Sequence, residues 1–425
     1  MGIRQAIVPL LVLAPLLVLA VFTLTSSAGA VDVGDAGDPS PRAAQFGFHP
    51  GGDPGGGSSA PAAFGDPLRG LTPEELARFD AGRVAFEEEE DVADGLGPVF
   101  NGRSCVGCHD VGATGGGSTI VERRFGTTTD GAFDPLERLG GSLIQRAGIG
   151  PAGACNFVGE QVPPEATIVA GRRTTPLFGL GLVDAVPDAT FLALARFQKF
   201  FQPTTAGRAN IVTDVTTGKR AVGKFGWKSN VPNLLEFSAD AYLNELGITT
   251  PFFPDESCPQ GDCSLLACDP VPGVDDDNDD VEAFRDFMML LAAPPRPRLT
   301  LATLQGSLIF DEIGCASCHV RTLRTGPSDI AALRFRTFQP FSDFLLHDMG
   351  SLGDGIEQGI ASGREMRTAP LWGLRLLTTF LHDGRAVTIE EAILAHDGQG
   401  RRARARFAAL SPTKKARLLE FLGSL

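Results

Sequence analysis

Ser104-Cys105-Val106-Gly107-Cys108-His109 and Gly314-Cys315-Ala316-Ser317-Cys318-His319 are two copies of one pattern, Cys-x-x-Cys-His. This pattern is typical of c-type haem attachment, in which both cysteines form thioethers with the porphyrin vinyl groups and the histidine binds the iron. Two thiols one helical turn apart reach both vinyl groups from the same face, and the next residue then lies under the iron. A redox dithiol or half of a zinc site also contains Cys-x-x-Cys, but neither requires the following histidine. The sequence therefore predicts two covalently bound haem c groups, with His109 and His319 as iron ligands.

A longer internal repeat indicates two related domains. Arg173-Thr174-Thr175-Pro176-Leu177-Phe178-Gly179-Leu180 recurs as Arg367-Thr368-Ala369-Pro370-Leu371-Trp372-Gly373-Leu374, and each copy follows its own Cys-x-x-Cys-His motif. The spacing from motif to repeat is longer in the first copy, which indicates an insertion there. The expected fold is mainly α, with two cytochrome c-like haem domains over residues 69–298 and 299–425. The first of these domains is expected to be enlarged by loop and short-strand insertions.

The first 68 residues are expected to lie outside this fold. Residues 1–30 have the features of an export signal, since Arg4 precedes an almost wholly apolar run and Ala28-Gly29-Ala30 offers a cleavage site. The alternative is an uncleaved membrane anchor, because the apolar run approaches the length of a spanning helix. Residues 31–68 are rich in Gly, Pro, Ala and Asp, which favours a disordered tether. The expected location is periplasmic, with membrane attachment only through an uncleaved signal.

The composition limits the classes of possible binding partner and the number of aromatic residues that could carry electrons. The chain has 425 residues, a formal net charge of -14 and a pI near 4.9, which argue against nucleic acid and would suit a basic protein partner. It contains one tyrosine, Tyr242, and two tryptophans, Trp227 and Trp372. An aromatic electron relay therefore has few candidates.

Local patterns predict the first ordered helix. Thr72-Pro73-Glu74-Glu75 forms a capping box with proline at the first helical position, so a helix is expected to run to about Phe86. Its inward residues are expected to be Leu76, Phe79 and Val84. The acidic run at residues 87–91 that follows is expected to be a solvated surface.

Two helices are expected to frame the second haem domain. An apolar helix from near Leu299 to Phe310 leads to Cys315, and Ser411-Pro412 opens a terminal helix. The spacing of the apolar residues in the terminal helix predicts an inward stripe of Leu418, Phe421, Leu422 and Leu425.

Four cysteines remain outside the haem motifs: Cys155, Cys258, Cys263 and Cys268. In an oxidising compartment they predict one or two disulfides, whose connectivity the sequence leaves open. A free thiol or a metal cluster is the alternative, although the spacing does not match the usual zinc pairs.

The positions of the remaining histidines in the sequence indicate which iron could have a second histidine ligand. No histidine lies between His109 and His319, so only His49 in the tether could reach the first iron from the N-terminal half. In the second domain, a capping box at Thr388 starts a helix that places His396 on one face with Ile389, Ala392 and Ile393. His396 is therefore the expected second ligand of the C-terminal iron. Its rivals are Met349 and Met366, and His347 and His382 are left with propionate hydrogen bonding or domain packing as options.

Several stretches outside the haem motifs have a family signature: Gly95-Leu96-Gly97-Pro98-Val99-Phe100-Asn101, Gly223-Lys224-Phe225-Gly226-Trp227-Lys228, Glu245-Leu246-Gly247-Ile248-Thr249, Leu346-His347-Asp348-Met349-Gly350 and Leu381-His382-Asp383-Gly384-Arg385. From about Leu71 to Leu425 the chain resembles the bacterial di-haem oxidoreductase family, whose members are often labelled thiol oxidoreductases or peroxidases. More distantly, it is similar to the di-haem cytochrome c peroxidases and the methylamine-utilisation di-haem enzyme.

The resemblance implies further site residues. In those relatives a ligand of the C-terminal haem follows the His of the His-Asp-Gly motif by fourteen residues, which corresponds to His396 when counted from His382. The peroxidases also have a tryptophan between the haems and a glutamate in the N-terminal haem pocket, for which Trp227 and Glu245 are the nearest matches. The distal histidine that many peroxidases place over the N-terminal iron has no counterpart here.

The sequence thus favours a periplasmic di-haem oxidoreductase of the peroxidase kind. Its N-terminal haem would react with a small-molecule oxidant, with Glu245 as general acid/base, and its C-terminal haem would pass electrons through Trp227. A small redox protein such as a cytochrome or cupredoxin is the expected electron donor. The alternatives are a pure electron-transfer cytochrome and a thiol oxidoreductase that uses the four cysteines outside the haem motifs.

Overall fold

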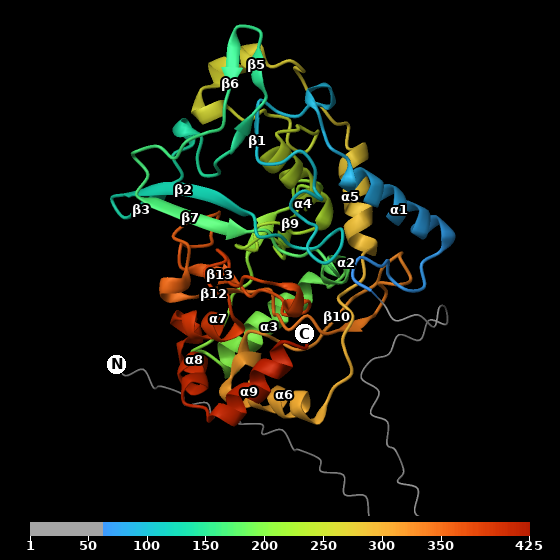
Figure 1. Cartoon of the computed structure of the whole chain (residues 1–425), viewed down its shortest axis with the longest axis vertical. Helices are drawn as coiled ribbons and strands as arrows, with labels where there is room; N and C mark the ends of the chain where they lie inside the picture. The colour runs from blue at the N-terminus through green and yellow to red at the C-terminus, as the bar shows by residue number, and fades with distance from the viewer. Residues whose placement is uncertain (1–62) are drawn as a thin grey trace, which may run out of the picture. The chain divides into compact units, whose positions relative to one another are not determined.

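The computed structural model describes residues 63–425 (Figure 1). The predicted export signal, most of the predicted tether and His49 lie outside the described residues. The structured region begins earlier than residue 69, however. The Phe64 ring packs against Phe178 with ring centroids 5.5 Å apart, and the Leu68 amide donates to the Leu290 carbonyl at 2.7 Å. Residues 63–68 are therefore part of the fold rather than of the tether.

The helices are α1 (Pro73–Glu87), α2 (Leu180–Asp184), α3 (Asp188–Phe201), α4 (Leu234–Ala241), α5 (Asp279–Leu290), α6 (Leu301–Ile313), α7 (Ile389–Ala395), α8 (Arg401–Ala408) and α9 (Pro412–Leu422). The strands are β1 (Val99–Phe100), β2 (Val121–Thr129), β3 (Ala132–Asp134), β4 (Ala147–Gly148), β5 (Gly150–Ala152), β6 (Cys155–Phe157), β7 (Ile168–Arg173), β8 (Ile211–Thr213), β9 (Arg220–Val222), β10 (Leu323–Arg324), β11 (Thr337–Phe338), β12 (Leu346–Asp348) and β13 (Glu365–Arg367). Among residues 63–425, no helix is long and apolar enough to cross a membrane.

The fold is mixed α and β rather than mainly α, although the short strands expected in the first predicted domain are present. Short antiparallel pairs occur in both halves, and the largest sheet has the order β3-β2-β7, with Val121 opposite Arg173 (Figure 1). The physical reason is that the chain between the first haem motif and α4 folds largely as hairpins, which satisfy their backbone groups between strands instead of within helices. The haem motifs say nothing about this inserted stretch.

The described residues belong to one compact unit, with no division near residue 298. The largest apolar core joins Phe86 and Phe287 from the first predicted domain to Leu323, Phe338 and Trp372 from the second. The two predicted haem domains therefore share one core, and the boundary between them at residue 298 stays a prediction that rests on the internal repeat.

Helix α1 confirms the predicted capping box but buries a different face. The Thr72 hydroxyl accepts from the Glu75 amide, and the Glu75 carboxylate accepts from the Thr72 amide. The buried residues are Phe79, Gly82 and Phe86. Helix α1 lies against α5 (Figure 1). A side chain at Gly82 would collide with the Ala283 carbonyl oxygen, so glycine permits this close approach. The expectation that Leu76 and Val84 point inward was wrong, because both lie on the exposed side.

The acidic run after α1 is not uniformly solvated as predicted. Glu90 is buried, and its carboxylate accepts a 2.9 Å hydrogen bond from the Tyr242 hydroxyl. Burial raises the pKa of Glu90 to about 7. The correction arises from tertiary packing, since Tyr242 lies far along the chain on the element after α4.

The C-terminal helix matches its prediction. Helix α9 begins after the Ser411 cap and packs against α6 (Figure 1). Its residues Leu418, Phe421 and Leu422 are buried, as is Leu425 just after it. Together with Phe310 and Phe407 these residues form a second apolar core. That core is the support on which the second haem motif, directly after α6, is placed.

The four cysteines outside the haem motifs form two disulfides, Cys155–Cys268 and Cys258–Cys263, which confirms the prediction of one or two bridges. The first bridge ties the β5–β6 hairpin to the short helical turn at residues 263–268. The sequence left this connectivity open.

The internal repeat is also a structural repeat. Arg173 ends strand β7 and Arg367 ends strand β13. Six residues later, Gly179 and Gly373 adopt left-handed backbone conformations, with φ of 74° and 73°, and a short helical turn follows each. The same sequence thus builds the same turn twice.

Candidate functional site

Two cavities each contain one Cys-x-x-Cys-His motif. The His109 cavity is lined by Cys105, Cys108 and His109 and has a volume of 660 Å³. The His319 cavity is lined by Cys315, Cys318 and His319 and has a volume of 480 Å³. Both volumes are in the range of about 300–1,000 Å³ that is usual for cofactor sites.

The motif cysteines are not paired with one another. All four are free thiols, whereas the remaining cysteines form disulfides. Burial raises the pKa of the Cys105 thiol, and it raises that of Cys315 to about 12. A catalytic dithiol requires a thiol whose pKa is lowered, so these pairs do not have the character of a redox-active dithiol.

Three histidines share one hydrogen-bonding arrangement. The Nδ1 atoms of His109, His319 and His396 lie 2.9, 3.0 and 2.8 Å from the backbone carbonyl oxygens of Gly116, Phe341 and Ala392. A carbonyl oxygen can only accept, so Nδ1 carries the proton in each ring, and the Nε2 lone pair of His319 and His396 is left for a metal. The His109 ring also has a second backbone hydrogen bond, to Thr175. Burial also lowers the pKa values of His109 and His319 to about 4, which keeps both rings neutral at physiological pH.

His319 and His396 are spaced as two ligands of one metal ion. Their ring centroids lie 6.5 Å apart. Two metal–imidazole bonds of about 2 Å, with each nitrogen roughly 1 Å from its ring centre, give a separation of about 6 Å. His396 follows α7, whose capping box at Thr388 matches the prediction. Ile389, Ala392 and Ile393 line the same cavity, as the helical spacing predicted.

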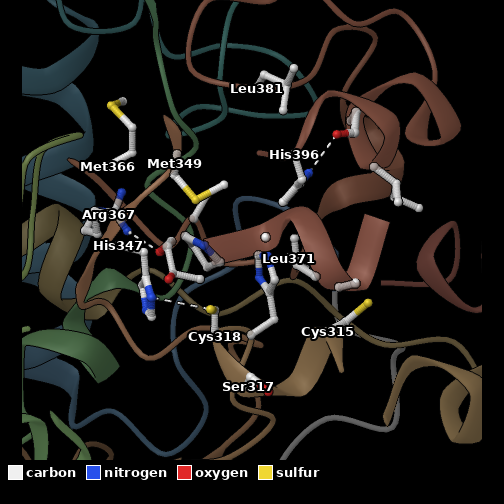
Figure 2. A pocket seen from close by; sticks show the side chains of 18 of the residues that line it. Cys315, Ser317, Cys318, His347, Met349, Met366, Arg367, Leu371, Leu381 and His396 are labelled. Atoms are coloured by element: carbon white, nitrogen blue, oxygen red, sulfur yellow. Dashed lines mark hydrogen bonds between the residues drawn. The ribbon is translucent and has the colours of Figure 1, made fainter. Parts of the chain in front are cut away.

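The two methionines predicted as rivals also line the His319 cavity. Figure 2 shows Cys315 and Cys318 on one side of this cavity and His396 and Met349 on the other, with Met366 farther away. Only His396 combines the 6.5 Å spacing from His319 with an oriented imidazole. The geometry therefore favours His396 over Met349 and Met366.

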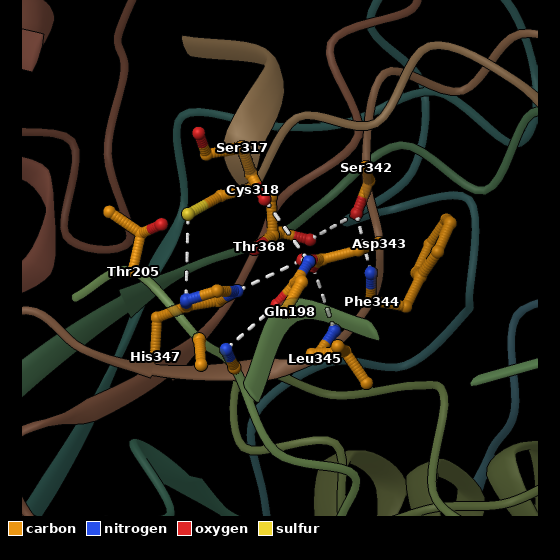
Figure 3. Close-up of polar contacts among 12 residues, drawn as sticks. Gln198, Thr205, Ser317, Cys318, Ser342, Asp343, Phe344, Leu345, His347 and Thr368 are labelled. Carbon is orange, nitrogen blue, oxygen red and sulfur yellow. Dashed lines mark hydrogen bonds and ion pairs between the residues drawn. The ribbon is translucent and has the colours of Figure 1, made fainter. Parts of the chain in front are cut away.

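His347 is held in a buried polar network beside the second haem motif (Figure 3). Its Nε2 lies 3.0 Å from the Asp343 carboxylate and its Nδ1 lies 3.0 Å from the Gln399 side-chain oxygen and 3.4 Å from the Cys318 sulfur. Gln198 donates to the same Asp343 carboxylate at 2.7 Å. Because both ring nitrogens of His347 are engaged, this histidine positions neighbouring groups and is not suited to bind iron.

The His109 cavity contains a pair of carboxyl groups instead of a second histidine. Among the described residues that line it, His109 is the only histidine. Glu245, on the π-helical turn at residues 242–246 after α4, forms a side-chain hydrogen bond with Glu122 on β2. Arg124 donates to the Glu122 carboxylate at 2.8 Å. Two carboxyl groups can only form a hydrogen bond if one of them carries a proton.

The surroundings place that proton on Glu245. Burial raises the pKa of Glu245 well above 4.5, and the neighbouring negative charge of Glu122 raises it further. Burial also disfavours the charge on Glu122, but the Arg124 guanidinium more than offsets this effect, and the pKa of Glu122 falls below 4.5. A neutral carboxylic acid thus faces the cavity beside a charged carboxylate, which is an arrangement able to donate a proton.

The two cavities share a wall. Arg173, Thr175, Gly226, Trp227 and Phe237 line both cavities. The Trp227 indole nitrogen donates to the Arg173 carbonyl oxygen at 3.0 Å, which holds the ring in place. His382 lines the His319 cavity, with its ring centroid 6.2 Å from that of Trp227. The structure therefore brings Trp227 between the two motif sites and places Glu245 in the first of them.

Sequence reasoning missed Glu122 and Arg124. Both are on β2, where residues two apart project to the same side of the strand. The signal available in the sequence was this oppositely charged pair at alternate positions of a strand-like run. It did not indicate that Glu245, more than a hundred residues away, would meet Glu122.

The residues in both cavities fit haem groups. Each cavity offers two free thiols for the vinyl groups and one neutral histidine oriented toward a metal, and the walls of the His319 cavity are largely apolar. His109 would be an iron ligand in the first cavity, and His319 and His396 in the second.

Comparisons with known proteins place this site in a family. The sequence profile described as "Di-haem oxidoreductase, putative peroxidase" matches residues 164–425, which is more than half of the chain. None of the curated proteins matches the chain.

Three solved structures are similar at low identity. The di-haem peroxidase BthA from Burkholderia thailandensis E264 is 13% identical, with a TM-score of 0.39, and the match covers 84% of this chain and 86% of that one. A MauG-like protein associated with microbial copper homeostasis is 16% identical, with a TM-score of 0.37 and coverages of 86% and 94%. The hydrazine synthase of Kuenenia stuttgartiensis is 15% identical, with a TM-score of 0.37 and coverages of 91% and 100%. On the strength of the profile match, the chain belongs to the di-haem oxidoreductase family and is a peroxidase-like redox enzyme with two haem groups.

Proposed function

We propose that this protein is a periplasmic di-haem c-type peroxidase with a reactive N-terminal haem and an electron-transferring C-terminal haem. Cys105 and Cys108 would hold the first haem covalently, and Cys315 and Cys318 the second. The observation that carries the proposal is the Glu245–Glu122 pair in the His109 cavity, which offers a proton donor where His109 is the only histidine among the described residues that line the cavity. Export would follow from the signal-like residues 1–30, and fractionation of cells that produce the full chain would test it.

Glu245 would supply a proton to the departing oxygen. A bound haem supplies the redox chemistry with the oxidant. Reduction of hydrogen peroxide to two molecules of water consumes two electrons and two protons. When the O–O bond breaks, the departing oxygen needs a proton, and the neutral Glu245 carboxyl group can give it. Arg124 then stabilises the negative charge left on the carboxyl pair, because it already contacts Glu122.

The His319 cavity would receive the electrons. His319 and His396 would together hold the iron of a haem in this cavity, which would suit electron transfer better than reaction with peroxide. The Trp227 ring in the shared wall would then relay electrons to the His109 cavity. A small cytochrome or cupredoxin would be the donor, and saturable turnover with such a purified protein would test this role.

Electron paramagnetic resonance of the purified oxidised protein tests the proposal. We expect one high-spin haem whose signal changes on addition of hydrogen peroxide, and one low-spin haem that becomes high-spin in a His396→Ala variant. His382→Phe is the matched control, since His382 lines the same cavity but has no Nδ1–carbonyl bond like that of His396. If both haems were low-spin and their signals did not change with peroxide, even after partial reduction, the protein would instead be a pure electron-transfer cytochrome.

Replacing Trp227 by phenylalanine is expected to slow electron transfer between the haems and to lower turnover by about tenfold or more. The reason is that phenylalanine has no indole to be oxidised and cannot donate to the Arg173 carbonyl oxygen. Stopped-flow spectroscopy of the reduced C-terminal haem after mixing with peroxide measures the rate. Trp372→Phe is the matched control, because Trp372 lines only the His319 cavity. Equal rates in the Trp227→Phe variant and the wild type would contradict the relay.

A further inference from the structure

The two arginines that begin the internal repeat are buried cations without an acidic partner. Arg173 and Arg367 are 6% and 8% exposed. Arg173 lines both cavities and Arg367 lines the His319 cavity. Within residues 63–425, neither guanidinium forms an ion pair, and the Arg173 Nε atom is buried without a hydrogen-bond partner. The Arg367 side chain donates only to the backbone oxygens of Gly226 and Thr368.

The same fold gives two other buried cations a carboxylate partner. Lys228 and Arg172 both pair with the Asp354 carboxylate at 2.8 Å, and all three side chains are almost completely buried. An isolated buried charge is costly, so a fold retains one only where a counter-ion compensates. Burial lowers the pKa of Arg367 only to about 10, so this side chain remains charged at neutral pH. Among residues 63–425, Arg173 and Arg367 have no carboxylate partner, and the guanidinium of Arg367 lies 5.5 Å from the centre of the Phe344 ring, which attracts a cation but is not a counter-ion.

Trp227 links the backbones of both arginines. Its indole nitrogen donates to the Arg173 carbonyl oxygen at 3.0 Å, and its own carbonyl oxygen accepts from the Arg367 amide at 2.8 Å. The two copies of the repeat are thus held at the shared wall, with one arginine from each copy facing a cavity. Other arginines that line the His319 cavity differ, since Arg402 and Arg406 are exposed to solvent and Arg404 pairs with Asp397 at 3.8 Å.

From this placement we infer that Arg173 and Arg367 each bind a propionate carboxylate of a haem, Arg173 in the His109 cavity and Arg367 in the His319 cavity. The inference rests on the proposed function, because it requires haem in both cavities. Each haem carries two carboxylates, and a planar guanidinium binds a carboxylate through parallel hydrogen bonds. The internal repeat is the reason for assigning one arginine to each haem, since each arginine follows the Cys-x-x-Cys-His motif of its own cavity. The repeat would then be a cofactor-anchoring element that occurs once for each haem.

Potentiometric titration of the purified di-haem protein tests this inference. A nearby positive charge favours the reduced iron, so Arg367→Gln should lower the midpoint potential of the low-spin haem, and Arg173→Gln that of the high-spin haem. The propionate bending modes in resonance Raman spectra should shift for the same haem only. Arg364→Gln is the matched control, because its side chain is 64% exposed, pairs with Asp348 and lines neither cavity. Both potentials and modes should stay unchanged in this control.

The outcomes separate this inference from the proposed function. If the wild type carries two haems but both glutamine variants keep wild-type potentials and propionate modes, the arginine assignment is wrong while the di-haem proposal stands. If the wild type carries no haem, the proposed function itself fails. If the Arg367→Gln variant cannot be purified with two haems, the haem content of Arg367→Lys is compared with that of Arg367→Met. Two haems in the lysine variant but not in the methionine variant would support the contact between Arg367 and a carboxylate. The same haem content in both variants would overturn it.

Discussion

Replacing Glu245 by glutamine is expected to lower peroxide turnover by about 10²–10⁴-fold, the usual contribution of a positioned general acid or base. Glutamine keeps the size of the side chain and its hydrogen bond to Glu122 but cannot give up a proton to a departing oxygen. Steady-state turnover with hydrogen peroxide and a small reductant measures the effect. Both haems should stay bound, with the spin states of the wild type.

The matched control is Glu236→Gln. Glu236 is also a buried carboxyl group whose pKa burial raises to about 7, and it lies on α4 close to Glu245 in the chain, but it lines neither cavity. We expect turnover close to that of the wild type. If both variants lost turnover equally, the effect of Glu245 would be on stability. If the Glu245→Gln variant kept the turnover of the wild type, Glu245 would not be the proton donor.

The pH dependence of the same reaction follows from the carboxyl pair. Glu245 carries its proton below its raised pKa, so turnover should fall as the pH rises through that value. Glu122→Gln removes the neighbouring negative charge, lowers the pKa of Glu245 and moves the decline to lower pH. Arg124 opposes Glu122 from the same strand, and Asp240, whose pKa burial raises to about 6, faces the same cavity. If turnover declined at the same pH in the Glu122→Gln variant and in the wild type, the decline would be due to the titration of a group other than Glu245.

Replacing Cys105 and Cys108 together by serine is expected to reduce the covalent haem content from two per chain to one and to abolish peroxide turnover. Serine cannot form the thioether bonds, so no haem can be attached covalently in the His109 cavity. The Cys315→Ser/Cys318→Ser variant should also lose one haem, but it should lose the low-spin signal instead of the high-spin one. Pyridine haemochrome spectra and mass spectrometry of the chain measure the haem content.

Cys258 and Cys263 supply the control for this experiment. They form a disulfide that lines neither cavity, so Cys258→Ser/Cys263→Ser should keep two haems and most of the activity. If turnover instead depended on this pair or on Cys155–Cys268, the thiol oxidoreductase alternative would be favoured. Retention of two covalent haems without Cys105 and Cys108 would contradict the attachment sites.

The sequence by itself determined the features that depend on short spacings. The Cys-x-x-Cys-His motifs, the capping boxes at Thr72 and Thr388 and the face of α7 that places His396 beside Ile393 all follow from residues within one or two helical turns. Hydrogen bonds and side-chain directions inside a helix are set locally, so these patterns survive in the folded structure.

Only the tertiary structure decided which distant residues meet. Glu122 on β2 contacts Glu245 after α4, Glu90 is buried by Tyr242, and the two repeat arginines meet the backbone around Trp227. Sheet pairing and burial depend on the packing of segments that are a hundred residues apart, for which a single sequence contains no periodic signal. The motifs therefore indicate which histidines could hold iron, whereas packing decided which charged groups surround them, and those groups determine the chemistry that we propose.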